Sequence, residues 1–356
     1  MHKPPTSTSL LRLPYSCHIR DRAHPSAASF GLPAAVIARL LDIQHQNVAA
    51  SMMAQVPSDS NDVGISLPSH ALGSPASAAL QIMSDLHFET PKFLPMYNEF
   101  QIEPRAKYPA LLGDIGIAGD DSLFDFVTRQ LSQFEVVFYV LGNHEPYPSR
   151  CEDAVARMEA FERLIASRKV LEQQQNENGH FSLGRFVFLN RRRFDLLSKV
   201  TILGCTLFSH ISDEQRSTVS LFVSDFSNFA DWSVDRHNAA HQADLDWLNA
   251  EVETIARDEP QRSIVVLTHY SPTAAPEAND PEHVEDSRGV QSAFVTDLQK
   301  EPCWMSTSVK VWAFGHTHYN CDFFDGTTGK LVVANQRGYG REDIFNFDSE
   351  KTIGIV

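Results

Sequence analysis

Short apolar runs separated by helical patterns fill the chain from about residue 78 to its end. The runs consist mostly of Val, Ile, Leu and Phe, and they are nearly continuous rather than alternating. Such runs are typical of strands that are covered on both faces. We predict eight strands, one in each of the runs LQIMSD (80–85), PALLGD (109–114), EVVFYVLG (135–142), RFVFLN (185–190), VTILGCTLF (200–208), SIVVLTH (263–269), VKVWAFGH (309–316) and KLVVANQ (330–336).

Amphipathic helical patterns lie between these runs. In residues 151–169 and again in residues 238–258, apolar side chains recur every three or four positions, which is the spacing of one helical face. Strands that alternate with helices predict an α/β architecture. The last stretch, residues 344–356, has the pattern of an edge strand or a closing hairpin.

The first 76 residues differ in composition from the rest. They are rich in Ser, Pro and Ala and have little periodic apolar character, so we expect a largely disordered N-terminal extension ahead of a domain over residues 77–356. Residues 32–43 predict a short helix within it. The first forty positions hold several arginines but only one acid, Asp21, so a mitochondrial presequence is the alternative to a tail with no targeting role.

Polar residues with metal-binding atoms follow five of the predicted strands. A single Asp or His in such a place is most often a turn or cap residue, but core strands have no structural reason to end this way repeatedly. The ligand site of an open α/β sheet lies beyond the carboxyl ends of its strands, so we expect these side chains to share one rim. They are Asp85, His87, Asp114, Asn143, His144, Glu145, His269, His316 and His318.

The chemistry of this set narrows the kind of site. Imidazole and carboxylate together suit Mn, Fe or Zn, whereas Ca and Mg prefer oxygen ligands and structural Zn recruits thiolates. With His144 and Glu145 set aside, the set has two Asp, one Asn and four His, and these seven are too many ligands for one tetrahedral ion. They suit two divalent or trivalent ions about 3.5–4 Å apart that share a bridging carboxylate.

The composition and charge of the chain limit the kinds of molecule that it is expected to bind. The chain has 356 residues, 42% hydrophobic and 21% charged, and a formal net charge of −15, which makes nucleic acid a poor partner and leaves a small phosphorylated substrate as the expected one. Its five cysteines form no CxxC pair, so a reducing, cytoplasmic location is expected. No apolar run reaches the roughly 18 residues that a membrane span requires. The oligomeric state is left open.

Five blocks in order resemble the calcineurin-like metallophosphoesterase superfamily: DLH (85–87), GD (113–114), GNHE (142–145), THY (268–270) and GHTH (315–318). The resemblance spans roughly residues 78–340. It implies a four-layer α/β/β/α sandwich of two mixed sheets, with a dimetal site at the C-terminal strand ends.

The resemblance also assigns roles to the residues of these blocks. The first ion would be held by Asp85, His87 and His318. The second would be held by Asn143, His269 and His316, with Asp114 as the bridge. We expect the glycines of GD, GNH and GHTH to let the backbone turn sharply, so that the ligands converge.

The expected reaction is hydrolysis of a phosphomonoester or phosphodiester by a hydroxide that bridges the metals, with His144 as general acid. Asn143, His144 and Arg337 are expected to contact substrate, although Arg337 could instead bond nearby carbonyls. For Glu145, orienting a neighbour and lying in solvent are both open. Residues 210–232 predict a loop over the site.

One departure from the family pattern separates this chain from the usual serine/threonine protein phosphatases. Their second block reads GDxxDRG, but here Ile117 and Ala118 stand where that Asp and Arg would fall. The chain therefore lacks both the phosphate-gripping Arg and the Asp that pairs with the catalytic His. A protein phosphatase, a non-catalytic scaffold with the same fold and a metal-dependent nuclease are the alternatives to a small phosphoesterase.

Overall fold

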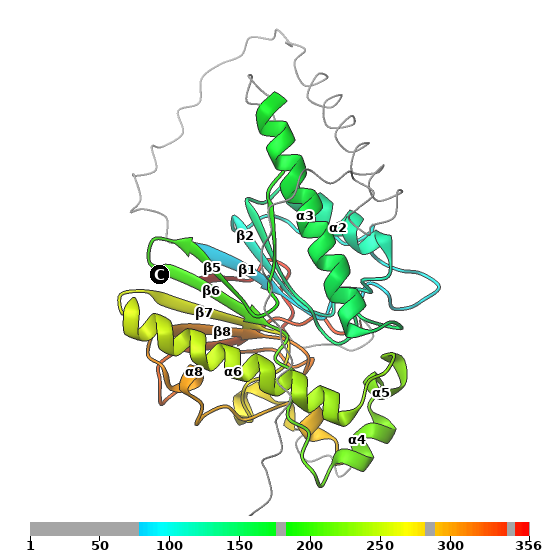
Figure 1. Ribbon diagram of the computed structural model, residues 1–356, viewed down its shortest axis with the longest axis vertical. Coiled ribbons are helices and arrows are strands. Elements are labelled where there is room, and N and C mark those ends of the chain that lie inside the picture. Colours follow the sequence, from blue (N-terminus) through cyan, green and yellow to red (C-terminus); the bar gives the residue numbers. More distant parts are fainter. Residues whose placement is uncertain (1–77, 176–182, 282–288, 340–345, 356) are drawn as a thin grey trace, which may run out of the picture.

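Two β-sheets packed face to face form the centre of the molecule (Figure 1). The computed structural model describes residues 78–175, 183–281, 289–339 and 346–355. The predicted N-terminal extension, its short helix and its alternative interpretation as a presequence lie outside the described residues.

The first sheet has five strands in the order β11-β1-β2-β3-β4. Strands β1 to β4 run parallel, and β11 pairs antiparallel with β1 at one edge. The edge strand predicted near the C-terminus is therefore present. The bounds are Ala79–Met83 (β1), Tyr108–Leu112 (β2), Val136–Val140 (β3), Arg185–Phe188 (β4) and Thr352–Gly354 (β11).

The second sheet has six strands in the order β5-β6-β7-β8-β10-β9. Its four central strands are parallel, and β5 and β9 pair antiparallel at the two edges. The bounds are Arg192–Leu197 (β5), Val200–Cys205 (β6), Ser263–Thr268 (β7), Val309–Phe314 (β8), Cys321–Phe324 (β9) and Leu331–Ala334 (β10).

Helices cover the outer face of each sheet, which completes the predicted four layers (Figure 1). Helices α2 (Asp121–Leu131) and α3 (Cys151–Gln175) pack on the first sheet, and α6 (Val234–Asp258) and α8 (Pro302–Met305) pack on the second. The fold is thus the α/β/β/α sandwich of two mixed sheets that the family resemblance implied.

The near-continuous apolar runs have a direct explanation in this layering. In β7, Val265 and Leu267 point into the core between the two sheets, whereas Ile264 and Val266 point into the core beneath α6. All four side chains are buried. Because successive residues of a strand face opposite sides, a strand with a core on each side has no polar position.

The two edge strands β5 and β9 and helix α2 were not predicted. Strand β5 reads RRFDLL and is only partly buried, because an edge strand has one side open to solvent. Because this strand contains charged residues, a search for continuous apolar runs does not identify it.

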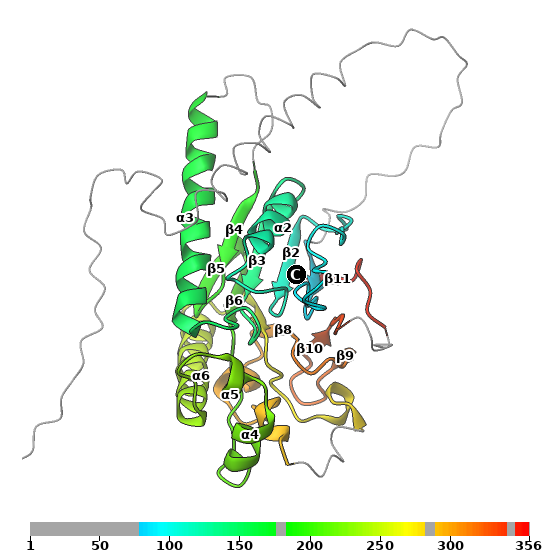
Figure 2. The same cartoon turned by 90° about the vertical axis from the view of Figure 1, so that its right-hand side faces the viewer.

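The segment between β6 and α6 was predicted as a loop and contains two short helices, α4 (Arg216–Phe222) and α5 (Asp225–Asn228). They lie beside the start of α6 (Figure 2). Two short 3₁₀ turns, η2 (Pro276–Ala278) and η3 (Gln291–Ala293), follow β7. No helix in the described part of the chain is long and apolar enough to cross a membrane.

The two sheets are joined at the edge where their parallel strands end. Just after β1, the backbone N–H of Ser84 donates to the carbonyl of Asn335 at 3.0 Å, and Arg337 N–H donates back to the Ser84 carbonyl at 3.2 Å. After β7, His269 Nδ1 lies 2.8 Å from the carbonyl oxygen of Leu112. These bonds hold the strand ends of both sheets at one rim.

Candidate metal centre

The backbone at the strand ends is left-handed at five of the predicted ligands. These have φ between 46° and 73° and are Asp85, His87, Asp114, His316 and His318. Such a conformation costs a non-glycine residue roughly 1–3 kcal/mol and persists only where the surrounding structure fixes it. Clustered strain of this kind is typical of functional sites. Each strand turns away abruptly and leaves its polar side chain at the rim.

The glycines beside these ligands have two different roles, which corrects the single role predicted for them. Gly113 has φ +87° and does permit a sharp turn. Gly142 and Gly315 have no left-handed φ, and they provide space instead. A Cβ at Gly142 would lie 2.1 Å from Asp114 Oδ1, and one at Gly315 would lie 2.6 Å from Asp85 Oδ2.

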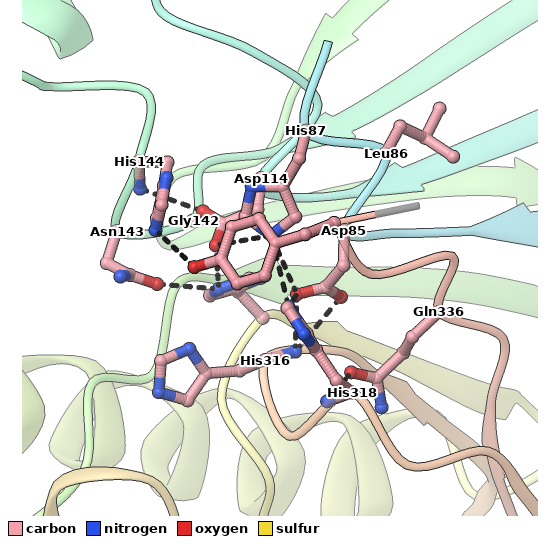
Figure 3. A network of polar contacts seen from close by, with 12 residues as sticks. Asp85, Leu86, His87, Asp114, Gly142, Asn143, His144, His316, His318 and Gln336 are labelled. Carbon is pink, nitrogen blue, oxygen red and sulfur yellow. Dashed lines mark hydrogen bonds and ion pairs between the residues drawn. The ribbon is translucent and has the colours of Figure 1, made fainter. Parts of the chain in front are cut away.

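The first group of ligand atoms comes from Asp85, His87 and His318, whose atoms all lie within 4.8 Å of one another. Asp85 Oδ1 is 3.4 Å from His318 Nε2, and the Nε2 atoms of His87 and His318 are 3.1 Å apart. Figure 3 shows these side chains converging from separate segments of the chain. This is the set predicted for the first ion.

The second group comes from Asp114, His269 and His316, again with atoms within 4.8 Å of one another. Asn143 joins it, because its Oδ1 lies 3.1 Å from His269 Nε2. The set therefore brings together the residues predicted for the second ion and the bridge.

Asp114 lies between the two groups. Its Oδ2 is 3.8 Å from His87 Nε2 and 3.5 Å from His269 Nε2. One carboxylate oxygen thus faces an imidazole nitrogen of each group, as a bridging ligand requires.

The described residues fit metal ions. Burial lowers the pKa of His316 well below its usual value, so the ring is neutral, and its buried Nε2 has no hydrogen-bond partner among the described residues. Two buried carboxylates, Asp85 and Asp114, lie among the imidazole nitrogens of both groups, and such a set of oxygen and nitrogen donors can bind cations. Mixed oxygen and nitrogen donors suit Mn, Fe or Zn.

Glu145 holds two of the ligand loops together. It is fully buried, and its two oxygens accept from Gly142 N–H at 2.8 Å, Asp114 N–H at 3.1 Å, Ile115 N–H at 2.9 Å and the Tyr139 hydroxyl at 2.8 Å. Burial, reinforced by the charge of Asp114, raises the pKa of Glu145 to about 7. Of the two roles left open for Glu145, the structure shows the orienting one.

His144 lies beside the two groups with one face toward solvent. Its backbone N–H donates to Asp114 Oδ1 at 2.8 Å, its Nδ1 is 3.0 Å from Glu89 Oε1, and its Nε2 is 3.3 Å from the Tyr339 hydroxyl. The side chain is 13% exposed. Burial opposes protonation, but the carboxylates of Asp114 and Glu89 outweigh it and raise the pKa of His144 to about 9. The two carboxylates therefore favour the protonated ring.

The guanidinium group of Arg337 contacts other residues of this protein. Its Nη1 donates to the Leu86 carbonyl at 2.8 Å, its Nη2 lies 3.5 Å from Met96 Sδ, and its guanidinium carbon lies 5.7 Å from the centre of the Phe100 ring. These contacts fit the carbonyl-bonding alternative for Arg337. Its contact with substrate stays a prediction.

Three residues near the site were missed by the sequence analysis: Glu89, Asp225 and Tyr339. Only Glu89 carried a usable signal, because it follows His87 by two residues and so could lie on the same side of an extended segment. Asp225 lies on α5, inside the segment 210–232 that was predicted to lie over the site, but no local pattern distinguished it from its neighbours, and Tyr339 lies beyond β10.

The fold and this site define a metallophosphoesterase. The chain belongs to the calcineurin-like phosphoesterase family, whose model matches residues 81–320. Uncharacterized protein L509 of Acanthamoeba polyphaga mimivirus is 24% identical to it over 283 residues, which cover 74% of this chain and 92% of that protein.

Two solved structures were found to be similar to this chain to different degrees. Phosphopantetheinyl hydrolase (PptH) from Mycobacterium tuberculosis superposes with a TM-score of 0.53 at 16% identity, over 75% of this chain and 92% of that one. A dimetal phosphatase from Danio rerio gives a TM-score of 0.38 at 16% identity, over 74% of this chain and 88% of that one.

Proposed function

We propose that this protein hydrolyses a small phosphomonoester or phosphodiester at a centre of two divalent or trivalent ions, with Mn, Fe or Zn as the candidates. The observation that carries the proposal is the place of Asp114. Its Oδ2 faces His87 Nε2 at 3.8 Å and His269 Nε2 at 3.5 Å, one nitrogen from each ligand group. A carboxylate so placed is suited to be shared by two ions.

The ligands divide as the two groups do. Asp85, His87 and His318 would hold one ion, and Asn143, His269 and His316 the other, with Asp114 shared. Ions bound there would lower the pKa of a coordinated water and neutralise charge on the phosphoryl oxygens.

His144 supplies the proton for the leaving oxygen in this proposal. Its Nδ1 faces Glu89, so its Nε2 is the atom directed to the open side of the site, where the Tyr339 hydroxyl lies at 3.3 Å. A protonated Nε2 donates to a departing alkoxide, which contributes on the order of 10² to 10⁴ in rate for a poor leaving group.

A small phosphorylated substrate fits the described residues better than a phosphoprotein. Ile117 and Ala118 occupy the positions where protein phosphatases of the family have Asp and Arg. Ala118 is buried, and the Ile117 backbone N–H is bonded to the Tyr97 hydroxyl at 3.0 Å. The net charge of −15 opposes nucleic acid and other polyanions.

The test is metal analysis and assay of the full chain purified without chelator, using p-nitrophenyl phosphate and bis(p-nitrophenyl) phosphate with added Mn²⁺. We expect two ions per chain and turnover of at least one ester. Asp114→Asn should lose both an ion and most activity, whereas Asp213→Asn, at a side chain that is 93% exposed, should retain both. Full activity in Asp114→Asn, or fewer than one ion per chain at saturation, would refute the dimetal proposal.

A further inference from the structure

Glu89 joins the first ligand group to the proposed general acid. Its Oε1 lies 3.0 Å from His87 Nδ1 and 3.0 Å from His144 Nδ1, so one oxygen atom serves both rings. The Glu89 side chain is 9% exposed, and the ring centres of the two histidines are 4.5 Å apart. His144 is 55 residues from Glu89 along the chain.

The chemistry of a carboxylate fixes the protonation of both rings. An ionised carboxylate only accepts hydrogen bonds, so the Nδ1 atoms of His87 and His144 must both carry the proton. A histidine that binds a metal ion through Nε2 offers a lone pair there, and the Nε2 of His87 faces Asp85, Asp114 and His318 in and beside the first ligand group. A hydrogen bond of this kind on the remote nitrogen sets the tautomer and basicity of a metal-binding histidine.

The same bond acts differently on His144. A general acid must carry protons on both nitrogens, and the negative charge of Glu89 stabilises that imidazolium. One carboxylate oxygen, 3.0 Å from His144 Nδ1, is placed to do so.

Glu89 also lies where a carboxylate that is missing from the second sequence block would be needed, beside His144. The Asp that pairs with the catalytic histidine in the GDxxDRG block has no counterpart here, because Ile117 occupies its position. In space, the carboxylate beside His144 comes from the segment after β1 instead.

We propose that Glu89 is a positioning residue whose single oxygen Oε1 orients both His87 as a metal ligand and His144 as a proton donor. The His144 half of the proposal rests on the proposed phosphoesterase function, and the His87 half does not. A carboxylate at this position is not explained by its contribution to stability. Glu89 Oε2 is buried without a hydrogen-bond partner among the described residues, and such an atom lowers the stability of the fold.

The experiment compares Glu89→Gln and Glu89→Ala with Glu99→Gln, an exposed glutamate on the same loop. The first measurement is Mn²⁺ titration of the metal-free chain by calorimetry. We expect binding of one ion to weaken about 10- to 100-fold in both Glu89 variants, the usual effect of removing a carboxylate behind a metal-binding histidine. Glu99→Gln should titrate like wild type.

The second measurement is hydrolysis at saturating Mn²⁺ of p-nitrophenyl phosphate and phenyl phosphate. The nitrophenolate leaves without a proton, so the Glu89 variants should keep most of that activity, whereas phenyl phosphate turnover should fall about 10²-fold. His144→Ala should show the same dependence on the leaving group. Adding Glu89→Gln to His144→Ala should then cost little more for phenyl phosphate, because both act through one ring.

The outcomes separate the two proposals. A wild-type chain that cleaves neither ester refutes the proposed function, while the Mn²⁺ titration still tests the bond to His87. If the wild type is active but the Glu89 variants match Glu99→Gln in either measurement, the shared-carboxylate proposal is wrong. Glu89→Gln has the shape of the native side chain, and its melting temperature identifies any loss that comes from misfolding.

Discussion

Asp225 accepts a hydrogen bond from the Asn143 side-chain amide, Nδ2 to Oδ1, at 2.8 Å, although the two residues are 82 positions apart. The amide oxygen is thereby left to face His269 Nε2 at 3.1 Å. Asp225 is buried on α5 and also accepts from the hydroxyls of Tyr147 and Tyr270. The segment between β6 and α6 thus reaches the second ligand group through one carboxylate.

Removing this carboxylate should release the amide of Asn143. In Asp225→Ala we expect the ion held by Asn143, His269 and His316 to bind about 10-fold more weakly, because a carboxamide that rotates freely presents its oxygen only part of the time. The other ion should keep its affinity. Calorimetric Mn²⁺ titration resolves the two, with Asp213→Ala as an exposed control from the same segment. Equal loss at both sites would contradict this role.

Gly142→Ala tests the space beside the shared carboxylate. The added Cβ would lie 2.1 Å from Asp114 Oδ1, so either that side chain or the backbone of Gly142 must move. A displacement of about 1 Å at a reacting centre can cost on the order of 10² in rate. We expect that loss in kcat/KM for p-nitrophenyl phosphate, while Gly326→Ala, where the added Cβ meets nothing within 4 Å, should be unaffected.

Metal removal should destabilise the fold near the rim. Ions that bind only the native state add RT ln(1 + [L]/Kd), about 2.7 kcal/mol per ion at 100 times its Kd. Chelator should therefore lower the melting temperature of the wild type, and added Mn²⁺ should restore it. His316→Ala should recover less on adding Mn²⁺, since it lacks one ligand. If the wild type had the same melting temperature with and without chelator, that result would be inconsistent with two bound ions.

Lys330, which lies outside the candidate metal centre, leads to a prediction about how the stability of the fold depends on pH. Its ammonium is buried, donates to the Trp304 carbonyl, and lies 4.6 Å from the centre of the Trp304 ring. Burial, partly offset by the charge of Asp325, lowers the pKa of Lys330 from 10.5 to about 8. Between these two values the unfolded chain holds a proton that the native state has lost.

The sign of the effect follows from that difference. Stability contributed by Lys330 is present above pH 10.5 and is lost as the pH falls through 8. Relative to Lys330→Met, the wild type should therefore gain free energy of unfolding as the pH is raised from 7 to 10. Urea unfolding of both proteins across this range gives the difference, and a difference that does not change with pH would show that Lys330 titrates normally.

The pattern of the sequence was enough to predict the strands and the candidate ligands at their ends, whereas the four layers were implied by the resemblance of its five blocks to a known family. Every predicted strand is present, because a strand between two cores has apolar residues on both sides and reads as a continuous run. Asp114 and the ligands from the other four strand ends were visible for a similar reason, since a polar residue right after a buried strand stands out locally. The edge strands β5 and β9 lacked that contrast, as each has a side open to solvent.

The groups that hold those candidate ligands in place were visible only in the folded chain. Glu145 joins two ligand loops, Glu89 joins two histidines, and Asp225 holds Asn143 across 82 residues. The same holds for the glycines: a left-handed φ at Gly113 and a lack of space at Gly142 look identical in the sequence. A hydrogen bond or a steric clash depends on distances between segments, and local sequence patterns do not contain those distances.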